Sequence, residues 1–392
     1  MKQYVWLGAV AALGIAALPV QAAEIKIGFV TTLTGPAAVI GNDFRNGAEM
    51  ALQHIGKKMG PLDVNIIYGD DEQNPQKGKQ AVEKLVERDK VDVVTGQIWS
   101  NVLLASKDVV LDANKFLISA NAGPSDLAGK ACHKNFFNVS WQNDQTPMAL
   151  GELLNQKGVK SLYLVAPNYA AGQDMVAGVE RTFKGKIVGK DMTAWPAQMD
   201  WSAELTKVKA ANPDGVFVFY PGGHGPAFLT QYDQAGLTGK IPLYSVYTVD
   251  ALSLPLLQKA GNKTALGTFL TQMWAADMDN AANKKFVGDF KAKHGTYPSY
   301  YAAQAYDSIM LIKSGVEAVK GNLKDQDGMR KAFEAAKFDS VRGPFKMGKN
   351  HFPIQNFYAN EVVADKDGTW MNSNRQVVFK DHQDSYASQC KM

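Results

Sequence analysis

The sequence predicts an α/β protein of two doubly wound lobes, each built on a parallel sheet. Apolar, strand-like runs alternate with amphipathic helical stretches along most of the chain. The alternation is interrupted near Trp141 and then restarts, and the 392 residues exceed the size at which single cores stop growing. Continuous apolar strands separated by helices belong to parallel sheets that are covered on both faces. Two such runs therefore predict two lobes.

The expected elements follow one another without a long gap. In the first run we expect strands at 25–31, 64–68, 91–95 and 116–119, and helices at 41–57, 76–88 and 100–113. In the second run we expect helices at 146–157, 171–183, 203–210 and 224–234, and strands at 161–166, 187–192, 215–219 and 243–246. A strand at 267–272 then precedes helices at 283–294, 300–320 and 325–336, and a last strand at 356–363.

The N-terminus is typical of a cleaved signal peptide that spans residues 1–22. A single positive charge at Lys2 precedes an apolar run over 4–20, which ends in Val20-Gln21-Ala22. Small residues at the ends of that triplet suit signal peptidase, with cleavage after Ala22. A membrane anchor is the alternative, but the apolar run is short for a span of about 20 residues. We therefore expect a soluble protein exported to the periplasm.

Composition and motifs argue against an enzyme, a cofactor or a nucleic-acid partner. The net charge is only +4, with both signs interspersed and no basic block. No Gly-x-Ser-x-Gly elbow or Walker loop occurs, and six scattered histidines show no metal-ligand spacing. The acidic run Asp70-Asp71-Glu72 is open to interpretation as a metal or acid/base site, but a solvated sheet edge is favoured.

The mature chain contains two cysteines, Cys132 and Cys390. In an oxidising compartment, two thiols most simply form one disulfide. Such a bond would hold the C-terminus against the segment that precedes the residues 135–139.

The loops that follow the expected strands carry the candidate ligand-binding residues. In open parallel sheets, ligands bind beyond the carboxyl ends of the strands. These loops combine aromatic, small and uncharged hydrogen-bonding side chains, as in pockets with apolar walls and few polar contacts. The alternative is that each aromatic side chain packs under its own loop. The candidates are Trp99, Ser100, Ala120, Asn121, Ala122, Gly123, Asn168, Tyr169, His224, Tyr247 and Thr248.

Several segments together resemble the type I periplasmic substrate-binding proteins of ABC importers, in particular the leucine/branched-chain-amino-acid-binding family. The resemblance runs from Ile25 to Phe379. It is carried by Ile27-Gly28, Thr32-Leu33-Thr34-Gly35-Pro36, Gly41, Gly47-Ala48, Gly69-Asp70-Asp71, Asn74-Pro75, Thr95-Gly96, Ile118-Ser119 and Tyr169-Ala170-Ala171-Gly172.

The resemblance implies two lobes that close over a ligand, joined by three hinge strands at 136–141, 269–274 and between 343 and 352. One lobe would contain residues 24–141 and 275–345, and the other residues 142–274 and 346–392. It also implies a monomer that passes a small molecule to a membrane permease, rather than a sensory receptor domain.

The chain departs from amino-acid binders of that family at the ligand's charged groups. The family holds the α-carboxylate with a backbone amide and a hydroxyl, where this chain has Ala122 and Gly123. The acidic residue that meets the ammonium is replaced by Tyr247, and the nearby Asp250 is expected to cap a helix. Because a buried ammonium without an anionic partner is costly, we expect a ligand that lacks one.

The remaining features favour an aromatic or phenylpropenoid carboxylate. Ser100 and Asn101 open a helix, and the backbone amides of 122 and 123 are expected to be free to bind an anion. The aromatic candidates, with Trp274, would form walls. Two roles stay open for His224, in ligand binding or in its own turn, and two for Arg45, at an acid group or in a surface ion pair. Branched-chain amino acids, amides and urea are the alternative ligands.

Overall fold

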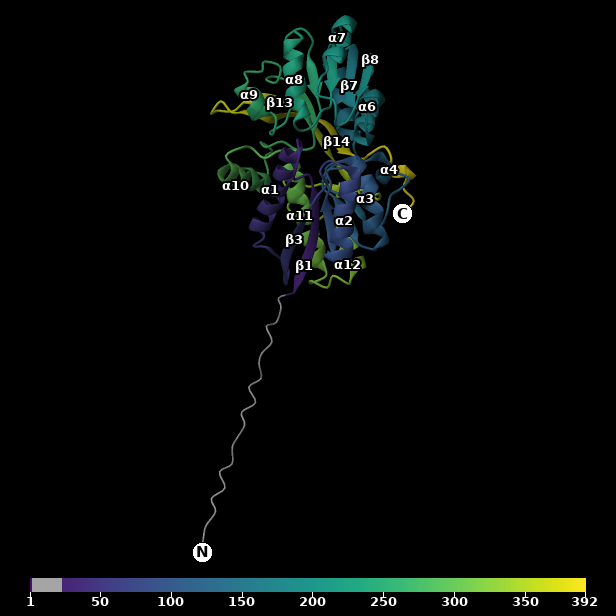
Figure 1. Cartoon of the computed structure of the whole chain (residues 1–392), viewed down its shortest axis with the longest axis vertical. Helices are drawn as coiled ribbons and strands as arrows, with labels where there is room; N and C mark the ends of the chain where they lie inside the picture. Colours follow the sequence, from purple (N-terminus) through teal and green to yellow (C-terminus); the bar gives the residue numbers. More distant parts are fainter. Residues whose placement is uncertain (2–22) are drawn as a thin grey trace.

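The computed structural model describes Met1 and residues 23–392, and it contains two lobes (Figure 1). The expected signal peptide at 1–22 lies outside the described residues, apart from Met1. Among the described residues, no helix combines the length and the apolar character that a membrane crossing needs.

The first lobe is built on a six-stranded sheet with the order β2-β3-β1-β4-β5-β6. All neighbouring strands are parallel except the short edge pair β2 and β3. The strands are β1 (Glu24–Thr31), β2 (Lys58–Met59), β3 (Leu62–Asp70), β4 (Val93–Gly96), β5 (Phe116–Ser119) and β6 (Phe136–Asn138).

The second lobe is built on the sheet β12-β13-β11-β10-β9-β7-β8, with β14 paired to β13. Its parallel part runs from β11 to β8, and β13 joins β11 antiparallel. The strands are β7 (Ser161–Pro167), β8 (Lys186–Thr193), β9 (Gly215–Val218), β10 (Leu243–Ser245), β11 (Phe269–Gln272), β12 (Lys346–Met347), β13 (Pro353–Ala364) and β14 (Trp370–His382).

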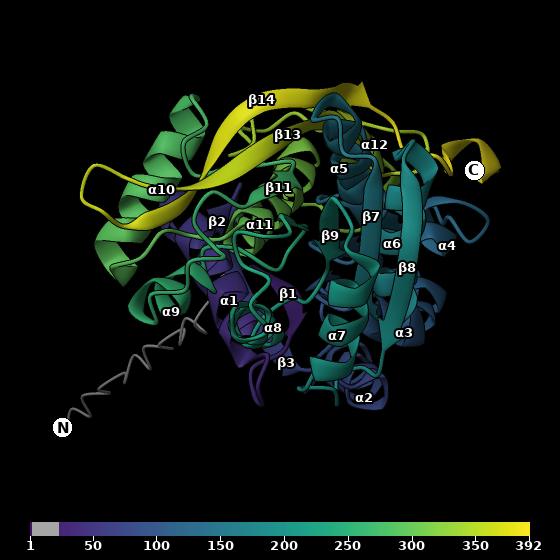
Figure 2. The same cartoon turned by 90° about the horizontal axis from the view of Figure 1, so that it is seen from above.

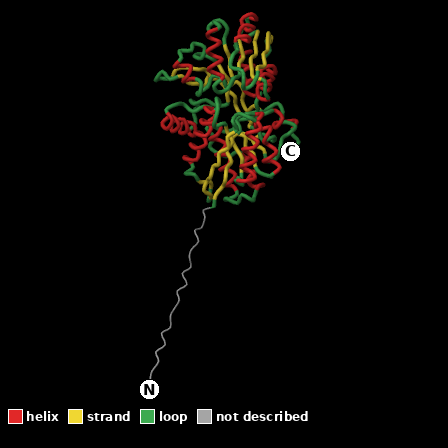
Figure 3. Tube along the Cα trace, viewed as in Figure 1, coloured by secondary structure: helices red, strands yellow, loops and turns green. Residues whose placement is uncertain are grey.

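Helices enclose both sheets, as the red and yellow segments of Figure 3 show. The helices are α1 (Ala38–His54), α2 (Pro75–Glu83), which continues as a π-helical turn to Arg88, α3 (Ser100–Asp112), α4 (Ser125–Ala128), α5 (Gln145–Gln156), α6 (Ala170–Thr182), α7 (Ser202–Ala211), α8 (His224–Gln234), α9 (Leu254–Lys259), α10 (Ala281–His294), α11 (Tyr300–Ala318) and α12 (Gln326–Ala335). The predicted α/β fold class is confirmed.

Two glycines let α1 pack closely in the first lobe. A Cβ at Gly41 would lie 1.6 Å from the Thr32 carbonyl oxygen, and one at Gly47 would lie 2.1 Å from that of Ala302. Any side chain at these positions would therefore push α1 away from the β1 loop and from α11. The close contact places the first strand-end loop at the interface between the lobes.

The chain passes between the lobes after β6, after β11 and after α12, and a buried arginine links the first and third of these passages. Arg342 Nε lies 3.0 Å from an Asp307 carboxylate oxygen on α11. The same guanidinium donates to the Ser140 carbonyl at 3.2 Å and to Gln355 Oε1 on β13 at 2.7 Å. Because its partners come from both lobes, the arginine fixes where the connecting segments cross.

The sequence did not predict β14, which pairs with β13 over most of its length. The two strands form a long ribbon across the second lobe (Figure 2). Several β14 side chains between 374 and 382 are exposed or half-buried, and the strand mixes charged and apolar residues without a clean period of two. Its partner, rather than its own pattern, therefore makes it a strand.

The predicted disulfide between Cys132 and Cys390 is present, with the two Cα atoms 5.7 Å apart. After β14 the chain returns to the first lobe, so the C-terminus lies beside α4 (Figure 1). The bond thereby ties the end of the chain to the lobe in which the chain begins.

Removing this bond is expected to destabilise the protein. It joins residues 258 positions apart, and a chain-entropy estimate for such a loop is about 5 kcal/mol, an upper value because measured effects are often smaller. Cys132→Ser, Cys390→Ser and the double variant should all lower the Tm by the same amount, measured by circular dichroism. Reduction of the unmodified protein should match them. An unchanged Tm on reduction would contradict the stabilising role.

Candidate ligand-binding site

A cavity of about 300 Å³ lies between the two lobes, where the strand-end loops meet. Loops and helix starts of both lobes contribute to it, together with the segment that connects β6 to α5. The lining residues are Ile98, Trp99, Ser100, Asn121, Trp141, Asn143, Tyr169, Ala171, Met175, Phe219, Pro221, Tyr247 and Tyr301.

Two helices, one from each lobe, begin at this cavity without a side-chain cap. The N-cap residues Trp99 of α3 and Tyr169 of α6 make no capping hydrogen bond through their side chains. The first backbone N–H groups of a helix have no partner within the helix, and the helix dipole adds partial positive charge there. The cavity is therefore electropositive at two points through backbone groups alone.

Ser100 adds a hydroxyl donor at the start of α3. Its Oγ accepts a hydrogen bond from Asn143 Nδ2 at 3.0 Å, so its own hydrogen remains to be donated. The side chain is buried and lines the cavity. A hydroxyl donor beside uncapped backbone amides is an arrangement that suits a carboxylate.

Asn143 also donates a hydrogen bond to the carboxylate of Asp174 on α6. Its Nδ2 lies 2.9 Å from Asp174, which accepts two further bonds from Ser125. Burial raises the pKa of Asp174, and the residue is not among those that line the cavity. None of the described residues that line the cavity carries a charged side chain.

Six of the thirteen residues that line the cavity are aromatic. Tyr247 stacks on Trp141 with ring centroids 4.6 Å apart, and its hydroxyl is paired with Thr146. Tyr169 stacks on Trp195 at 5.2 Å, and Trp195 in turn lies 5.6 Å from Trp99. Offset stacks of this kind hold the rings in fixed orientations.

The lobes touch across the cavity on opposite sides, which describes a closed form. On one side, Ser125 of α4 donates to Asp174 of α6 at 2.9 Å. On the other side, the Tyr300 hydroxyl at the start of α11 donates to Asp250 at 3.2 Å. The cavity is thereby enclosed between these contacts.

Five of the residues that the sequence pointed to are brought together here: Trp99, Ser100, Asn121, Tyr169 and Tyr247. The expectation that Tyr247 occupies a cavity without an acidic side chain therefore agrees with the geometry. Asp250 does not cap a helix as expected, because α9 begins after Ser253; its Oδ1 instead accepts from the backbone of Leu252 and Ser253 in the turn before α9. Asp250 is in addition bonded to Tyr300.

The prediction that the backbone amides of Ala122 and Gly123 are free is wrong. The Ala122 N–H donates to the Gln97 carbonyl at 2.9 Å, and the Gly123 N–H donates to Asn143 Oδ1 at 3.1 Å. A Cβ at Gly123 would lie 2.0 Å from the Trp141 carbonyl oxygen. Both N–H groups of this loop are therefore already hydrogen-bonded within the protein. The loop orients Asn143 and offers no donor to a ligand.

His224 takes neither of its two expected roles. Its Nε2 donates to the Pro196 carbonyl at 2.8 Å, and its ring packs on Trp195 at 4.7 Å. Burial lowers the pKa of His224, which keeps the ring neutral. The histidine therefore supports Trp195 from behind and does not line the cavity.

Three other predicted residues also lie outside the lining. Ala120 donates its N–H to the Gly96 carbonyl, and Thr248 Oγ1 accepts from Tyr220 N at 2.8 Å. Asn168 is exposed, and its Oδ1 accepts from Gln173. All three residues stabilise the loops through these hydrogen bonds without lining the cavity.

The interpretation of the acidic run as a solvated edge was wrong for Asp71. This residue is fully buried, and its Oδ1 accepts from Thr32 Oγ1 at 2.5 Å. Asp70 accepts from Leu33 N at 2.8 Å and from Thr34 Oγ1 at 2.7 Å. The pair shapes the loop after β1. Among the described residues, no group of three potential metal ligands gathers.

The sequence missed the lining residues Ile98, Trp141, Asn143, Ala171, Met175, Phe219, Pro221 and Tyr301. Ile98 and Pro221 belong to strand-end loops that were already singled out. Trp141 and Asn143 sit on a connecting segment between lobes, and Tyr301 begins a helix remote in sequence. Trp274, expected as a wall, lies elsewhere, with its Nε1 bonded to Asn283 Oδ1. Arg45 is exposed.

A family model described as periplasmic binding protein matches residues 24–369. The chain belongs to the periplasmic binding protein family. The expected resemblance to the substrate-binding proteins of ABC importers is confirmed. The family consists of binding proteins and not enzymes, and membership implies a periplasmic location.

Relatives support this assignment over nearly the full length. A Leu/Ile/Val-binding protein homologue of Brucella abortus (strain 2308) is 28% identical and covers 95% of this chain and 96% of its own. An ABC-transporter solute-binding protein from R. palustris, solved with benzoate, is 30% identical with a TM-score of 0.87, covering 94% of this chain and 100% of that chain. One from Rhodopseudomonas palustris BisB5, solved with 3,4-dihydroxybenzoic acid, is 25% identical with a TM-score of 0.83, covering 92% and 99%.

Buried carboxyl groups next to the cavity make stability depend on pH. Burial raises the pKa of Asp43, which accepts from Ser299, to about 7, and the pKa of Asp250 to about 6. Because these values exceed that of the unfolded chain, the folded state binds protons more tightly. The ionised carboxyl groups therefore lower the free energy of unfolding most above pH 7. This effect disappears as the pH falls and the groups become protonated.

We therefore expect these two carboxyl groups to contribute a rise in the free energy of unfolding as the pH is lowered from about 8 to about 5. Buried histidines such as His382, whose pKa is lowered by burial to about 4, oppose this rise below about pH 6.5. Asp43→Asn, which keeps an acceptor for Ser299 and carries no charge, should flatten this rise. Urea unfolding at several pH values measures how the free energy of unfolding depends on pH. The variant Asp339→Asn, at an exposed position, is the control. An equal slope in Asp43→Asn and the unmodified protein would show that Asp43 does not titrate as described.

Proposed function

We propose that this protein captures a small aromatic or phenylpropenoid carboxylate in the periplasm and delivers it to the permease of an ABC importer. The observation that supports this most is the character of the closed cavity. Aromatic rings wall it, two uncapped helix N-termini open into it, and none of its lining side chains is charged.

The charge balance favours an anion over a zwitterion. A carboxylate would gain from the start of α3 and from the Ser100 hydroxyl. An α-ammonium would find no ionised partner among the lining residues, because Asp174 is engaged by Asn143 and Ser125. An unpaired charge inside a closed cavity costs several kcal/mol, on the order of a thousandfold in affinity.

The aromatic walls favour a planar ring. Trp99, Tyr169 and Tyr247 line one cavity, and a stacked pair contributes about 0.5–1.5 kcal/mol beyond burial. Asn121 Nδ2 donates to the Ile98 carbonyl, whereas its Oδ1 has no partner among the described residues. That oxygen would accept from a ring hydroxyl. Benzoate and hydroxylated benzoates occupy the similar solved proteins.

In this proposal, the ligand contacts are made by the cavity-lining residues, and Ala120, Ala122, Gly123, Asn168, His224 and Thr248 act as their supports. The lobes at 24–141 plus 275–345 and at 142–274 plus 346–392 open to admit the ligand and close over it. Export would depend on cleavage after Ala22, and the closed monomer would dock on the permease.

A branched-chain amino acid is the second candidate, because the Brucella relative is a Leu/Ile/Val-binding protein homologue. The two candidates differ in the ammonium and in the aromatic ring, so a direct comparison of ligands separates them.

Thermal-shift measurements are expected to discriminate between these ligands. Benzoate, 4-hydroxybenzoate or coumarate should raise the Tm, since a ligand at 100 times its Kd adds about 2.7 kcal/mol. Leucine and the uncharged benzamide should leave the Tm unchanged. Stabilisation by leucine alone would refute the aromatic assignment, and equal stabilisation by benzamide would refute the role of the carboxylate.

Ser100→Ala should weaken benzoate binding by about tenfold or more, because a hydrogen bond to a charged group is worth about 1.5–3 kcal/mol. Ser202, which occupies the same first position in α7 but is exposed and absent from the cavity lining, supplies the matched control Ser202→Ala. Calorimetric titration measures both variants. If Ser100→Ala bound as tightly as Ser202→Ala, the carboxylate would not be held at α3.

A further inference from the structure

A continuous row of aromatic rings runs from the segment that connects the lobes to the start of α3. Neighbouring rings have centroids between 4.6 and 6.3 Å apart, distances that are typical of favourable aromatic pairs. In order, the row consists of Trp141, Tyr247, Phe219, Tyr169, Trp195 and Trp99. Five of these residues line the cavity between the lobes, whereas Trp195 does not.

Trp195 lies between the cavity and the solvent. It belongs to the loop after β8, in which its neighbours Ala194 and Pro196 are exposed and Trp195 itself is half-buried. Its ring contacts Tyr169 and Trp99, which both line the cavity. A half-buried ring that rests on two lining residues covers the cavity from the solvent side at that point.

These two ring partners of Trp195 belong to different lobes. Tyr169 begins α6 in the second lobe, and its ring is nearly parallel to that of Trp195, at 10°. Trp99 precedes α3 in the first lobe, and its ring lies at 55°. The stack on Tyr169 stays within one lobe, but the contact with Trp99 crosses from one lobe to the other. Opening of the lobes therefore separates Trp195 from Trp99 and leaves the Tyr169 stack intact.

Each ring of this crossing contact is held by its own lobe. Trp99 Nε1 donates to Thr32 Oγ1 at 2.8 Å. In the second lobe, His224 packs on the Trp195 ring and donates to the Pro196 carbonyl at 2.8 Å. The two faces are therefore preformed, and little side-chain freedom is lost when they meet.

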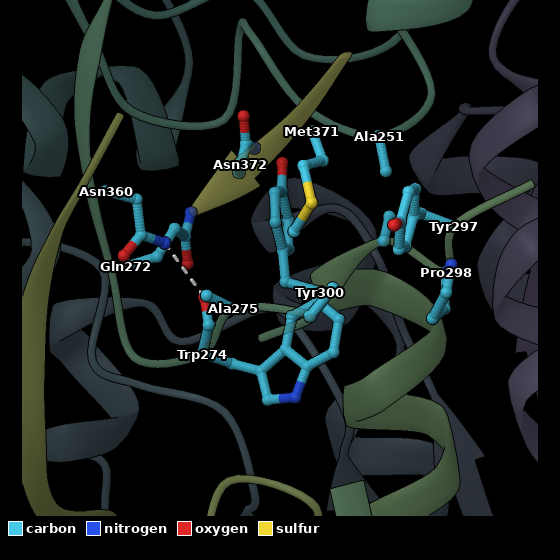
Figure 4. Close-up of a pocket in the computed structure, with 12 residues that line it drawn as sticks. Ala251, Gln272, Trp274, Ala275, Tyr297, Pro298, Tyr300, Asn360, Met371 and Asn372 are labelled. Carbon is cyan, nitrogen blue, oxygen red and sulfur yellow. Dashed lines mark hydrogen bonds between the residues drawn. The ribbon is translucent and has the colours of Figure 1, made fainter. Parts of the chain in front are cut away.

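The interface around Tyr300 offers no alternative path for a ligand. Tyr300 is bonded to Asp250 across the lobes. Beside it, Gln272 and Trp274 enclose a space with room for about one water molecule (Figure 4). An organic ligand cannot pass there while the lobes are closed, which leaves the half-buried Trp195 as the cover that must move.

We propose that Trp195 is a gate residue, which closes on Trp99 when the lobes close and thereby controls how fast a bound ligand is released. It is a positioning residue, because it acts through Tyr169 and Trp99 and not through a ligand contact of its own. The inference deepens the proposed function and rests on it for the ligand used as a probe. A contact that exists only in the closed form slows opening, but it does not affect the encounter of a ligand with the open form.

Rate constants for 4-hydroxybenzoate binding to the mature protein test the proposal, measured by stopped-flow tryptophan fluorescence. Trp195→Ala should raise the dissociation rate constant about three- to tenfold, the factor that one aromatic pair is worth, and leave the association rate constant unchanged. Trp195→Phe keeps a ring and should restore most of the loss. Trp370→Ala, at a half-buried tryptophan on β14 of the same lobe, should change neither constant. An unchanged dissociation rate in Trp195→Ala would overturn the proposal.

A double-mutant cycle separates gating from simple support of Tyr169. With Trp99→Leu in place, Trp195→Ala should hasten release by a smaller factor, because its partner in the other lobe is gone. If the two effects multiplied instead, Trp195 would act through Tyr169 alone and the gate would be refuted. Trp195→Leu, which keeps apolar bulk without a ring, takes the place of Trp195→Ala if that variant fails to fold.

The same rate constants measured with leucine separate this inference from the proposed function. Binding of leucine in place of 4-hydroxybenzoate would overturn the aromatic assignment alone. Trp195→Ala should then hasten the release of leucine by a similar factor, since the gate contacts the opposite lobe and not the ligand. Release of leucine at an unchanged rate would overturn the gate.

Discussion

A closed cavity without a charged side chain can stabilise a ligand charge only through backbone dipoles and hydroxyl donors. This constraint organises the centre of the molecule. Asn143 enforces it, because a single amide accepts from Gly123 and donates to Ser100 and to Asp174. The Asp174 carboxylate is thereby engaged, the Ser100 hydroxyl keeps its hydrogen for donation, and the uncapped start of α3 supplies the partial positive charge. The proposal that the ligand is an anion rests on these contacts.

The fold was largely predictable from the sequence because parallel strands and amphipathic helices are local patterns. Strand ends could also be located, which is why Trp99, Ser100, Asn121, Tyr169 and Tyr247 were found. Hydrogen-bond partners that are distant in the sequence could not be predicted. Ala122 and Gly123 appeared to offer free amides, but their N–H groups are used by a neighbouring loop and by a connecting segment. Likewise, β14 depends on its pairing with β13.

The connecting segments do more than join the lobes. Trp141 stacks on Tyr247, Asn143 directs the polar groups, and Gln272 opens onto a separate cavity. The Arg342–Asp307 pair holds these segments together inside the protein, where its hydrogen bonds to Ser140 and Gln355 offset the cost of burying charge. The segments that join the lobes thus also contribute side chains to the cavity between them.

The most direct test of this account is a crystal structure of the mature protein with 4-hydroxybenzoate. The account predicts the carboxylate at the start of α3, with oxygens about 2.7–3.2 Å from a backbone N–H or from Ser100 Oγ, and the ring between the aromatic walls. A carboxylate directed away from both helix starts would contradict it. So would a bound amino acid whose ammonium is paired with Asp174 or Asp250.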